Sequence, residues 1–322
     1  MKYRIRLKHK TAHFVVHIAF VILIAAFFAQ AEAASTRVKQ KTFPSAEEAV
    51  EALVSAIKIN DEKELRAIFG PSGDDLFSSG DPVADRQVRD RFLNRYETKN
   101  SLFPRQDTVL LLLGNDDWPF PIPVVKNGKR WSFDTAKGKE EILNRRIGEN
   151  ELNTINVCLA YVDAQREYAM MDVDGDGVPE YAEKLMSDPG KKNGLCWETQ
   201  EGEAPSPIGA VLAEARREGY GVKGAKDKAV PFHGYYYRAL KAQGKNAAGG
   251  AYEYVVKGKM IGGFALVAYP AKYGNSGIMT FLVNHDGVVF QKDLGNNTVK
   301  YAEDLKIFDP DKTWKKVTVA NK

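Results

Sequence analysis

The sequence predicts an α+β fold in which helices and antiparallel sheets occupy separate stretches of the chain. Two observations support this. Apolar residues first recur at intervals of three and four, which indicates helices, and later form short runs bounded by turn residues, which indicates strands. This order occurs twice. We therefore expect two units, at 35–150 and 151–322, after a segment 1–33 that is not part of the fold.

The first unit is expected to begin with three helices. Ser45 and Glu48 form a capping box, and the apolar face behind it comprises Ala49, Val50, Leu53, Val54 and Ile57. Asp61 can cap a second helix, and a third is expected over 85–96.

A small antiparallel sheet should follow these helices. Residues 108–113 form a buried-strand run, and 122–126 and 129–133 flank Asn127-Gly128, a strong hairpin signal. Helices followed by a curved antiparallel sheet resemble the order of NTF2-like cone folds.

The second unit should begin with a long helix over 139–171, followed by an acidic loop and a helix through Arg217. Antiparallel strands are expected at 234–241, 262–269, 277–284 and 288–292, with a closing helix at 298–306.

The first 33 residues have the pattern of a secretory signal peptide. A basic segment precedes an apolar run of 15 residues over 14–28, and small residues allow cleavage after Ala31 or Ala33. The alternative is an uncleaved anchor, but the run is short for a span of about 20 residues. We therefore expect a periplasmic or secreted protein with no membrane span after cleavage.

Cleavage changes the charge of the chain. The peptide carries five basic residues and one glutamate, a net charge of +4, which equals that of the whole chain. The remaining 289 residues are close to neutral, so nucleic acid is not an expected partner.

An acidic loop after the long helix has the spacing of an EF-hand calcium site. Counting from Asp172, the ligand positions are filled by Asp172, Asp174, Asp176, the carbonyl of Val178, Glu180 and Glu183. Gly177 permits the sharp bend, and we expect Glu183 to close the site from the first turn of a following helix. The alternative is a solvated acidic turn that caps a helix beginning near Pro179.

Two cysteines, Cys158 and Cys196, flank this loop. In an oxidising compartment they can form a disulfide, which would stabilise the fold by about 4 kcal/mol. The alternative is two buried free thiols, and spacing alone does not decide between them.

After cleavage only His233 and His285 remain, too few for a multi-histidine zinc site. His233 is expected in a strand, on the same face as Tyr235 and Tyr237. It is either a core histidine or part of a polar-aromatic groove. Ser276 follows a turn, and the two residues are the only candidates for catalysis.

Four strings in the sequence are distinctive: "WPFPIPVVKNGKRWSFDTAKGKEEILNRRIGENEL", "GYYYRALKAQG", "GGAYEYVVKGKMIGGFALVAYPAKYGNSGIMTF" and "VNHDGVVFQKDLG". They resemble the bacterial exported family DUF2950. The resemblance implies an extracytoplasmic bacterial protein and carries no established activity. Within it, the "AQREYA" helix, the "DGDG" turn and the sheet ending in "VNHDGVV" resemble pseudopilin globular heads.

The expected function is therefore a non-enzymatic binding or structural role in the envelope or outside the cell. The partner would be an envelope or extracellular protein or polymer, and calcium is the one expected cofactor. The alternative is a hydrolase-like enzyme that acts on an envelope polymer, using His233 with Ser276 or a carboxylate.

Overall fold

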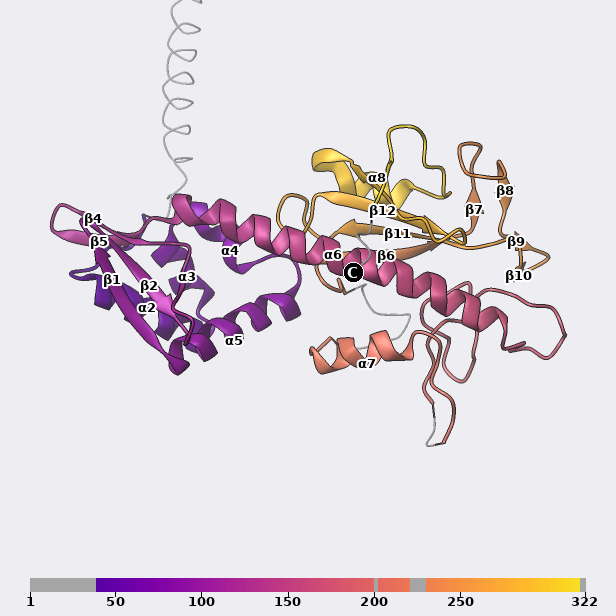
Figure 1. Cartoon of the computed structure of the whole chain (residues 1–322), viewed down its shortest axis with the longest axis horizontal. Helices are drawn as coiled ribbons and strands as arrows, with labels where there is room; N and C mark the ends of the chain where they lie inside the picture. The colour runs from indigo at the N-terminus through magenta and orange to yellow at the C-terminus, as the bar shows by residue number, and fades with distance from the viewer. Residues whose placement is uncertain (1–38, 200–201, 221–229, 319–322) are drawn as a thin grey trace, which may run out of the picture. The chain divides into compact units, whose positions relative to one another are not determined.

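The computed structural model describes residues 39–199, 202–220 and 230–318, and its fold is α+β as expected (Figure 1). The predicted signal peptide lies outside the described residues. Within them, no helix is both long and apolar enough to cross a membrane.

The first helices form where their caps predict them. They are α2 (Ala46–Lys58), α3 (Glu62–Phe69), the single turns η1 (Pro71–Gly73) and α4 (Asp74–Phe77), and α5 (Pro82–Thr98). The Ser45 hydroxyl accepts from the Glu48 amide at 3.1 Å, and the Asp61 carboxylate accepts from the Glu64 amide at 2.9 Å. Asp81 caps α5 in the same way.

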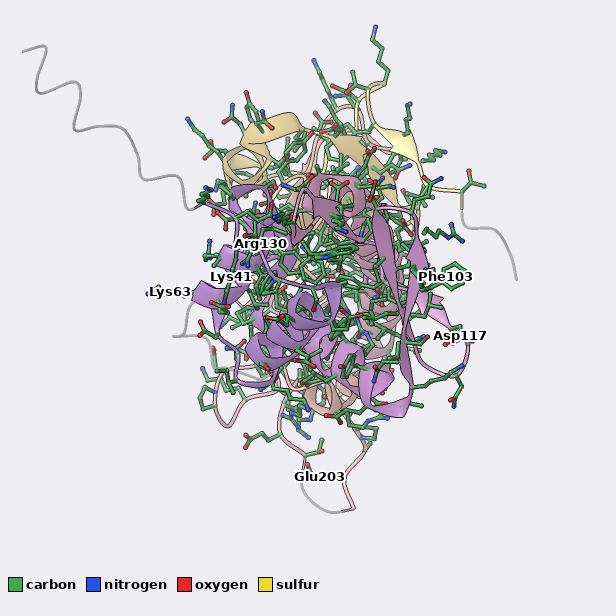
Figure 2. The ribbon with its side chains drawn as sticks, turned by 90° about the vertical axis from the view of Figure 1, so that its left-hand side faces the viewer. Lys41, Lys63, Phe103, Asp117, Arg130 and Glu203 are labelled. Carbon is green, nitrogen blue, oxygen red and sulfur yellow. The ribbon has the colours of Figure 1, made fainter. Side chains whose placement is uncertain are left out.

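The first sheet is antiparallel, with the order β1-β2-β4-β5 and β3 paired to β2. Its strands are β1 (Asn100–Arg105), β2 (Thr108–Leu113), β3 (Trp118–Pro119), β4 (Val124–Asn127) and β5 (Arg130–Phe133). β1 is an edge strand that was not expected, because it shows no regular alternation of apolar residues and contains Pro104. Phe103 projects from this edge (Figure 2).

The long helix α6 (Thr135–Ala169) joins two hydrophobic cores. The first core is built from residues between Phe43 and Phe133, and the second from residues between Cys158 and Phe308. The helix therefore passes without a break through residue 150, where we expected one unit to end.

The second sheet has the order β14-β13-β12-β11-β6, and all its pairings are antiparallel. The strands are β6 (Tyr235–Leu240), β11 (Ala265–Pro270), β12 (Met279–Asn284), β13 (Phe290–Asp293) and β14 (Lys315–Lys316). The Tyr237 hydroxyl lies 3.2 Å from Thr154 of α6, whereas the neighbouring Arg238 donates to Ala302 of α8 (Thr298–Asp304). Successive strand residues point to opposite faces, so α6 and α8 cover opposite faces of this sheet.

Two expectations about local structure were wrong. No helix follows the acidic loop, since residues 178–187 are irregular, with Tyr181 paired to Met260 and Met186 to Cys196 as isolated bridges. His233 is not in a strand; it lies in the turn before β6, with φ of +50°.

The remaining elements are short. The helix expected at 204–217 is shorter, as α7 (Gly209–Arg217). Two small ribbons pair β7 (Ala242–Gln243) with β8 (Tyr252–Glu253), and β9 (Val255–Val256) with β10 (Lys259–Met260).

Candidate functional site

The acidic loop forms a tight turn directly after α6. Both carboxylate oxygens of Asp172 accept from the Gly177 amide at 3.2 Å, and Asp176 accepts from the Val178 amide at 2.9 Å. Asp172, Asp174 and Asp176 each offer a carboxylate oxygen within 4.8 Å of the others, and all three are exposed. The spacing in the sequence thus brings three candidate ligands together at one point.

Lys259, from β10, supplies the counter-charge of this cluster. Its ammonium lies 2.5 Å from carboxylate oxygens of both Asp174 and Asp176, and 3.7 Å from the Glu180 carboxylate. These hydrogen bonds raise the pKa of Lys259, and the bond from Lys259 lowers the pKa of Asp176. Burial, by contrast, raises the pKa of Glu180. A protein ammonium therefore sits beside the oxygens that a metal ion would use.

The structure does not group Glu183 with the three aspartates. Its carboxylate pairs with the Lys241 ammonium at 2.5 Å. The expected closing geometry required a helix after the loop, and the residues there are not helical. The Val178 side chain is exposed.

The two cysteines are free thiols, and both are buried. Burial raises the pKa of Cys158 to about 12 and also raises the pKa of Cys196. Ser206 donates a long hydrogen bond, of 3.7 Å, to the Cys196 sulfur. Of the two alternatives, the structure has the pair of buried thiols.

Ser276 and His233 have different partners in the structure. Ser276 is fully buried, and its hydroxyl accepts from the Lys272 amide and donates to the Lys272 carbonyl. Among the described residues, the charged partner of His233 is Glu218, with 3.5 Å between Nε2 and Oε2. The structure therefore brings His233 to a carboxylate, while the Ser276 hydroxyl is engaged in its own turn.

His233 and Glu218 line a cleft of about 840 Å³ between α5, α6 and α7. This volume lies in the range of small-molecule sites, about 300–1,000 Å³. The Gln87 side chain, on α5, donates to the Glu218 carbonyl at 2.7 Å. The Glu218 oxygen Oε2 is buried and has no hydrogen-bond partner among the described residues.

A buried carboxylate fixes the turn that carries His233. Asp81 accepts from the Gly234 amide at 2.9 Å and from the Tyr220 hydroxyl at 2.8 Å, while its other oxygen caps α5. The Tyr220 oxygen in turn accepts from the His233 amide at 3.3 Å. Asp81 thus ties the beginning of α5 to the end of the cleft at which His233 and Glu218 meet.

The other end of the cleft is basic and aromatic. The guanidinium groups of Arg95 and Arg145 lie 5.6 and 5.7 Å from the ring centroid of Trp118. Phe92 meets Phe120 edge-on at 5.4 Å. The two ends therefore differ in charge and in apolar character.

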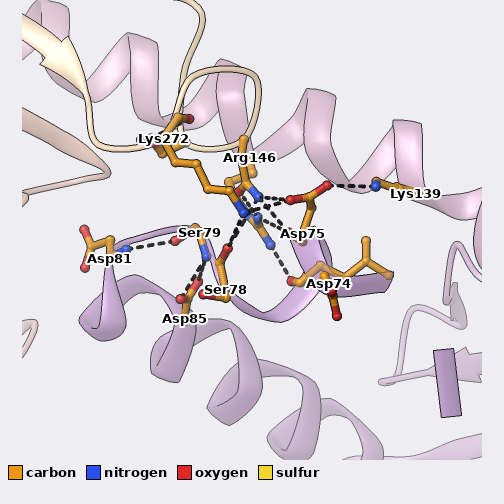
Figure 3. A network of polar contacts seen from close by, with 12 residues as sticks. Asp74, Asp75, Ser78, Ser79, Asp81, Asp85, Lys139, Arg146 and Lys272 are labelled. Atoms are coloured by element: carbon orange, nitrogen blue, oxygen red, sulfur yellow. Dashed lines mark hydrogen bonds and ion pairs between the residues drawn. The ribbon is translucent and has the colours of Figure 1, made fainter. Parts of the chain in front are cut away.

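A polar network includes Arg146, which also lines the cleft (Figure 3). Arg146 donates to the carbonyls of Asp75 and Leu76 and to the side chain of Asn275. Asp75 also forms ion pairs of 2.8 Å with Lys139 and Lys272, which lower its pKa. These bonds hold α4, α6 and the 272–277 turn together.

Comparison with known families decides where the chain belongs. A family model described as "Protein of unknown function (DUF2950)" matches residues 40–317. The chain belongs to the DUF2950 family. The resemblance in its sequence is thereby confirmed. No curated protein and no solved structure matches the chain, so the likenesses to NTF2-like folds and to pseudopilin heads stay predictions.

The acidic loop and the cleft of this DUF2950 chain both lie within the matched residues. Two charged residues of these candidate sites, Lys259 and Glu218, were not predicted from the sequence. Lys259 is one lysine among many in a short ribbon, and Glu218 follows the end of a solvated helix. No local signal marks either residue, because each acquires its role from a partner that is distant in the sequence.

Proposed function

We propose that this protein is exported and acts in the periplasm or outside the cell as a non-enzymatic binding protein. The signal-peptide pattern of residues 1–33 supports export. The observation that carries the binding role is the cleft, which has the volume of a ligand site and two chemically different ends. Its partner is an envelope or extracellular protein or polymer. The cleft would bind a chemical group of that partner that fits its volume.

Export and binding have direct tests. Expression in a bacterium with the signal intact should yield a periplasmic or secreted form whose first residue is Glu32 or Ala34, by mass spectrometry. Retention of the full-length chain in the cytoplasm would contradict export. The binding role predicts that a bound ligand slows hydrogen exchange in α5 and α6 around the cleft.

The proposal includes one structural calcium ion at the acidic loop. The ligands would be Asp172, Asp174 and Asp176, with the Val178 carbonyl, Glu180 directly or through water, and Glu183. Three of these already converge, and the Lys259 ammonium beside them indicates that the cluster needs a positive charge. Calcium would have to displace Lys259 and draw Glu183 away from Lys241. Bound there, it would tie the end of α6 to the segment 178–183 that follows the loop.

Thermal unfolding tests the calcium site. An ion at 100 times its dissociation constant adds about 2.7 kcal/mol to the free energy of unfolding, so calcium should raise the melting temperature of the chelated protein. Asp174→Asn should abolish this rise. No rise, together with no heat on titration with calcium, would leave the loop as an acidic turn paired with Lys259.

The alternative function is a hydrolase-like enzyme, which the 3.5 Å approach of His233 to Glu218 in the cleft favours. His233 would act with this carboxylate, because the Ser276 hydroxyl is buried and engaged elsewhere. The test is release of soluble fragments from purified cell-wall polymer by the mature protein. Release that disappears in both His233→Ala and Glu218→Gln would establish the enzyme, and absence of release would favour the binding role.

A further inference from the structure

We infer that the cleft binds a ligand that joins a carboxylate to an aromatic group, with the carboxylate at the end formed by Arg91, Arg95 and Arg145. This inference deepens the proposed binding role and rests on it. It follows from the placement of charge and of aromatic rings along α5 and α6.

The arginine end has an unused positive charge. Arg95 pairs with Asp116, and Arg145 pairs with Glu141, while both guanidinium groups lie near the Trp118 ring. Arg91 also lines the cleft, one helical turn before Arg95, and makes no side-chain hydrogen bond or ion pair with any described residue. A guanidinium group binds a carboxylate through two parallel hydrogen bonds, so Arg91 is available for a ligand anion.

Aromatic side chains lie beside this charge. Phe92 follows Arg91 on α5, and Trp118 and Phe120 complete the lining at this end. Phe92 and Phe120 already form an edge-to-face pair, the arrangement that aromatic rings prefer. A third ring, from the ligand, can pack against them while its carboxylate meets Arg91.

The opposite end sets the direction of the ligand. Glu149, Glu214 and Glu218 line it, and Glu149 forms no ion pair with a described residue. Gln87 contacts Glu218, and the eight helical steps from Gln87 to Arg95 rise about 12 Å. Arg146 also lines the cleft, but its guanidinium is bound to the carbonyls of Asp75 and Leu76. The charges left for a ligand are therefore acidic at one end and basic at the other, so a ligand anion is repelled at the first and attracted at the second.

Calorimetry with three compounds of the same shape tests the charge. The titrant would be N-acetyltryptophan, an anion, compared with neutral N-acetyltryptophanamide and cationic tryptophanamide, each added to the mature protein. We expect the anion to bind about tenfold or more tightly than the neutral amide, a difference of about 1.4 kcal/mol. The difference should shrink in high salt, which screens the exposed Arg91.

Two matched variants locate the site. Arg91→Glu should weaken binding of the anion about tenfold or more, because it replaces the attraction by repulsion. Arg105→Glu, at an exposed arginine on β1 outside the cleft, should bind like the original protein. Equal melting temperatures of the two variants would show that both fold.

Equal affinity for acid and amide, or normal binding by Arg91→Glu, would overturn the inference. Preferential binding of the cation would overturn it too, although the cleft would then still be a binding site. If none of the three compounds binds, the inference falls, while the calcium site is judged independently by the effect of chelator on unfolding.

Discussion

The hydroxyl of Tyr220 donates a hydrogen bond of 2.8 Å to the buried carboxylate of Asp81, a residue 139 positions earlier in the chain. Burial and the neighbouring carboxylate raise the pKa of Tyr220, so the hydroxyl stays protonated and remains a donor. The bond joins the start of α5 to the residues after α7, and the Tyr220 oxygen also accepts from the His233 amide. It therefore fixes the geometry of one end of the cleft.

Loss of this bond should destabilise the fold. Tyr220→Phe keeps the ring but removes a donor to a buried charge, and we expect the free energy of unfolding to fall by about 1.5–3 kcal/mol. Tyr252→Phe is the control, since the Tyr252 side chain is partly exposed and forms no hydrogen bond with a described residue. Urea unfolding measures both, and equal stability of the two variants would contradict the role of the bond.

Two glycines of α6 should respond in opposite ways to alanine. A Cβ at Gly138 would lie 2.5 Å from the Pro121 carbonyl oxygen, whereas a Cβ at Gly148 meets nothing within 4 Å. Gly148→Ala should stabilise the protein by about 0.5–1 kcal/mol through the greater helix propensity of alanine. Gly138→Ala should destabilise it by about 1–3 kcal/mol, because backbone must shift to make room. Two variants of similar stability would show that α6 does not pack against residue 121 in this way.

The fold should lose stability in acid through Asp75. Its ion pairs with Lys139 and Lys272 lower its pKa below the ordinary value of 3.8. A carboxyl whose folded pKa is lowered contributes fully above its unfolded pKa, and the contribution is lost as pH falls from about 4 toward the folded value. Asp75→Asn should therefore be less stable at pH 6 and show a weaker decline as the pH falls below about 4. Parallel pH profiles for the variant and the original protein would refute this.

Lys259 should compete with calcium for the acidic loop. Lys259→Met removes the ammonium from Asp174 and Asp176, so we expect a lower melting temperature in chelator and tighter calcium binding. Lys257→Met, two residues earlier and exposed, is the matched control and should change neither quantity. Unchanged calcium affinity in Lys259→Met would show that the ammonium and the ion do not compete for the same carboxylates.

The thiols of Cys158 and Cys196 should be protected only while the protein is folded. Both are buried and their pKa values are raised, so neither forms the reactive thiolate at neutral pH. A thiol reagent should label the native protein slowly and should count two thiols after unfolding in guanidinium. No reaction after unfolding would reveal a disulfide.

The amino-acid sequence by itself determined the elements that depend on near neighbours. Ser45 and Asp61 cap helices through amides three residues away, and Asn127-Gly128 turns a hairpin. The three aspartates of the acidic loop converge because alternate residues of a tight turn face one point. Such interactions depend only on residues that are close in the sequence.

Tertiary structure decided the rest. The edge strand β1 exists because β2 pairs with it, although it is mostly exposed and contains Pro104. Lys259 reaches Asp174 across 85 positions, and an irregular segment stands where a helix was expected to carry Glu183. His233 meets Glu218 only because Asp81 anchors its turn from 153 positions away. Hydrogen bonds and ion pairs between residues distant in the sequence form only after the cores have packed. The spacing of residues along the chain therefore cannot predict them.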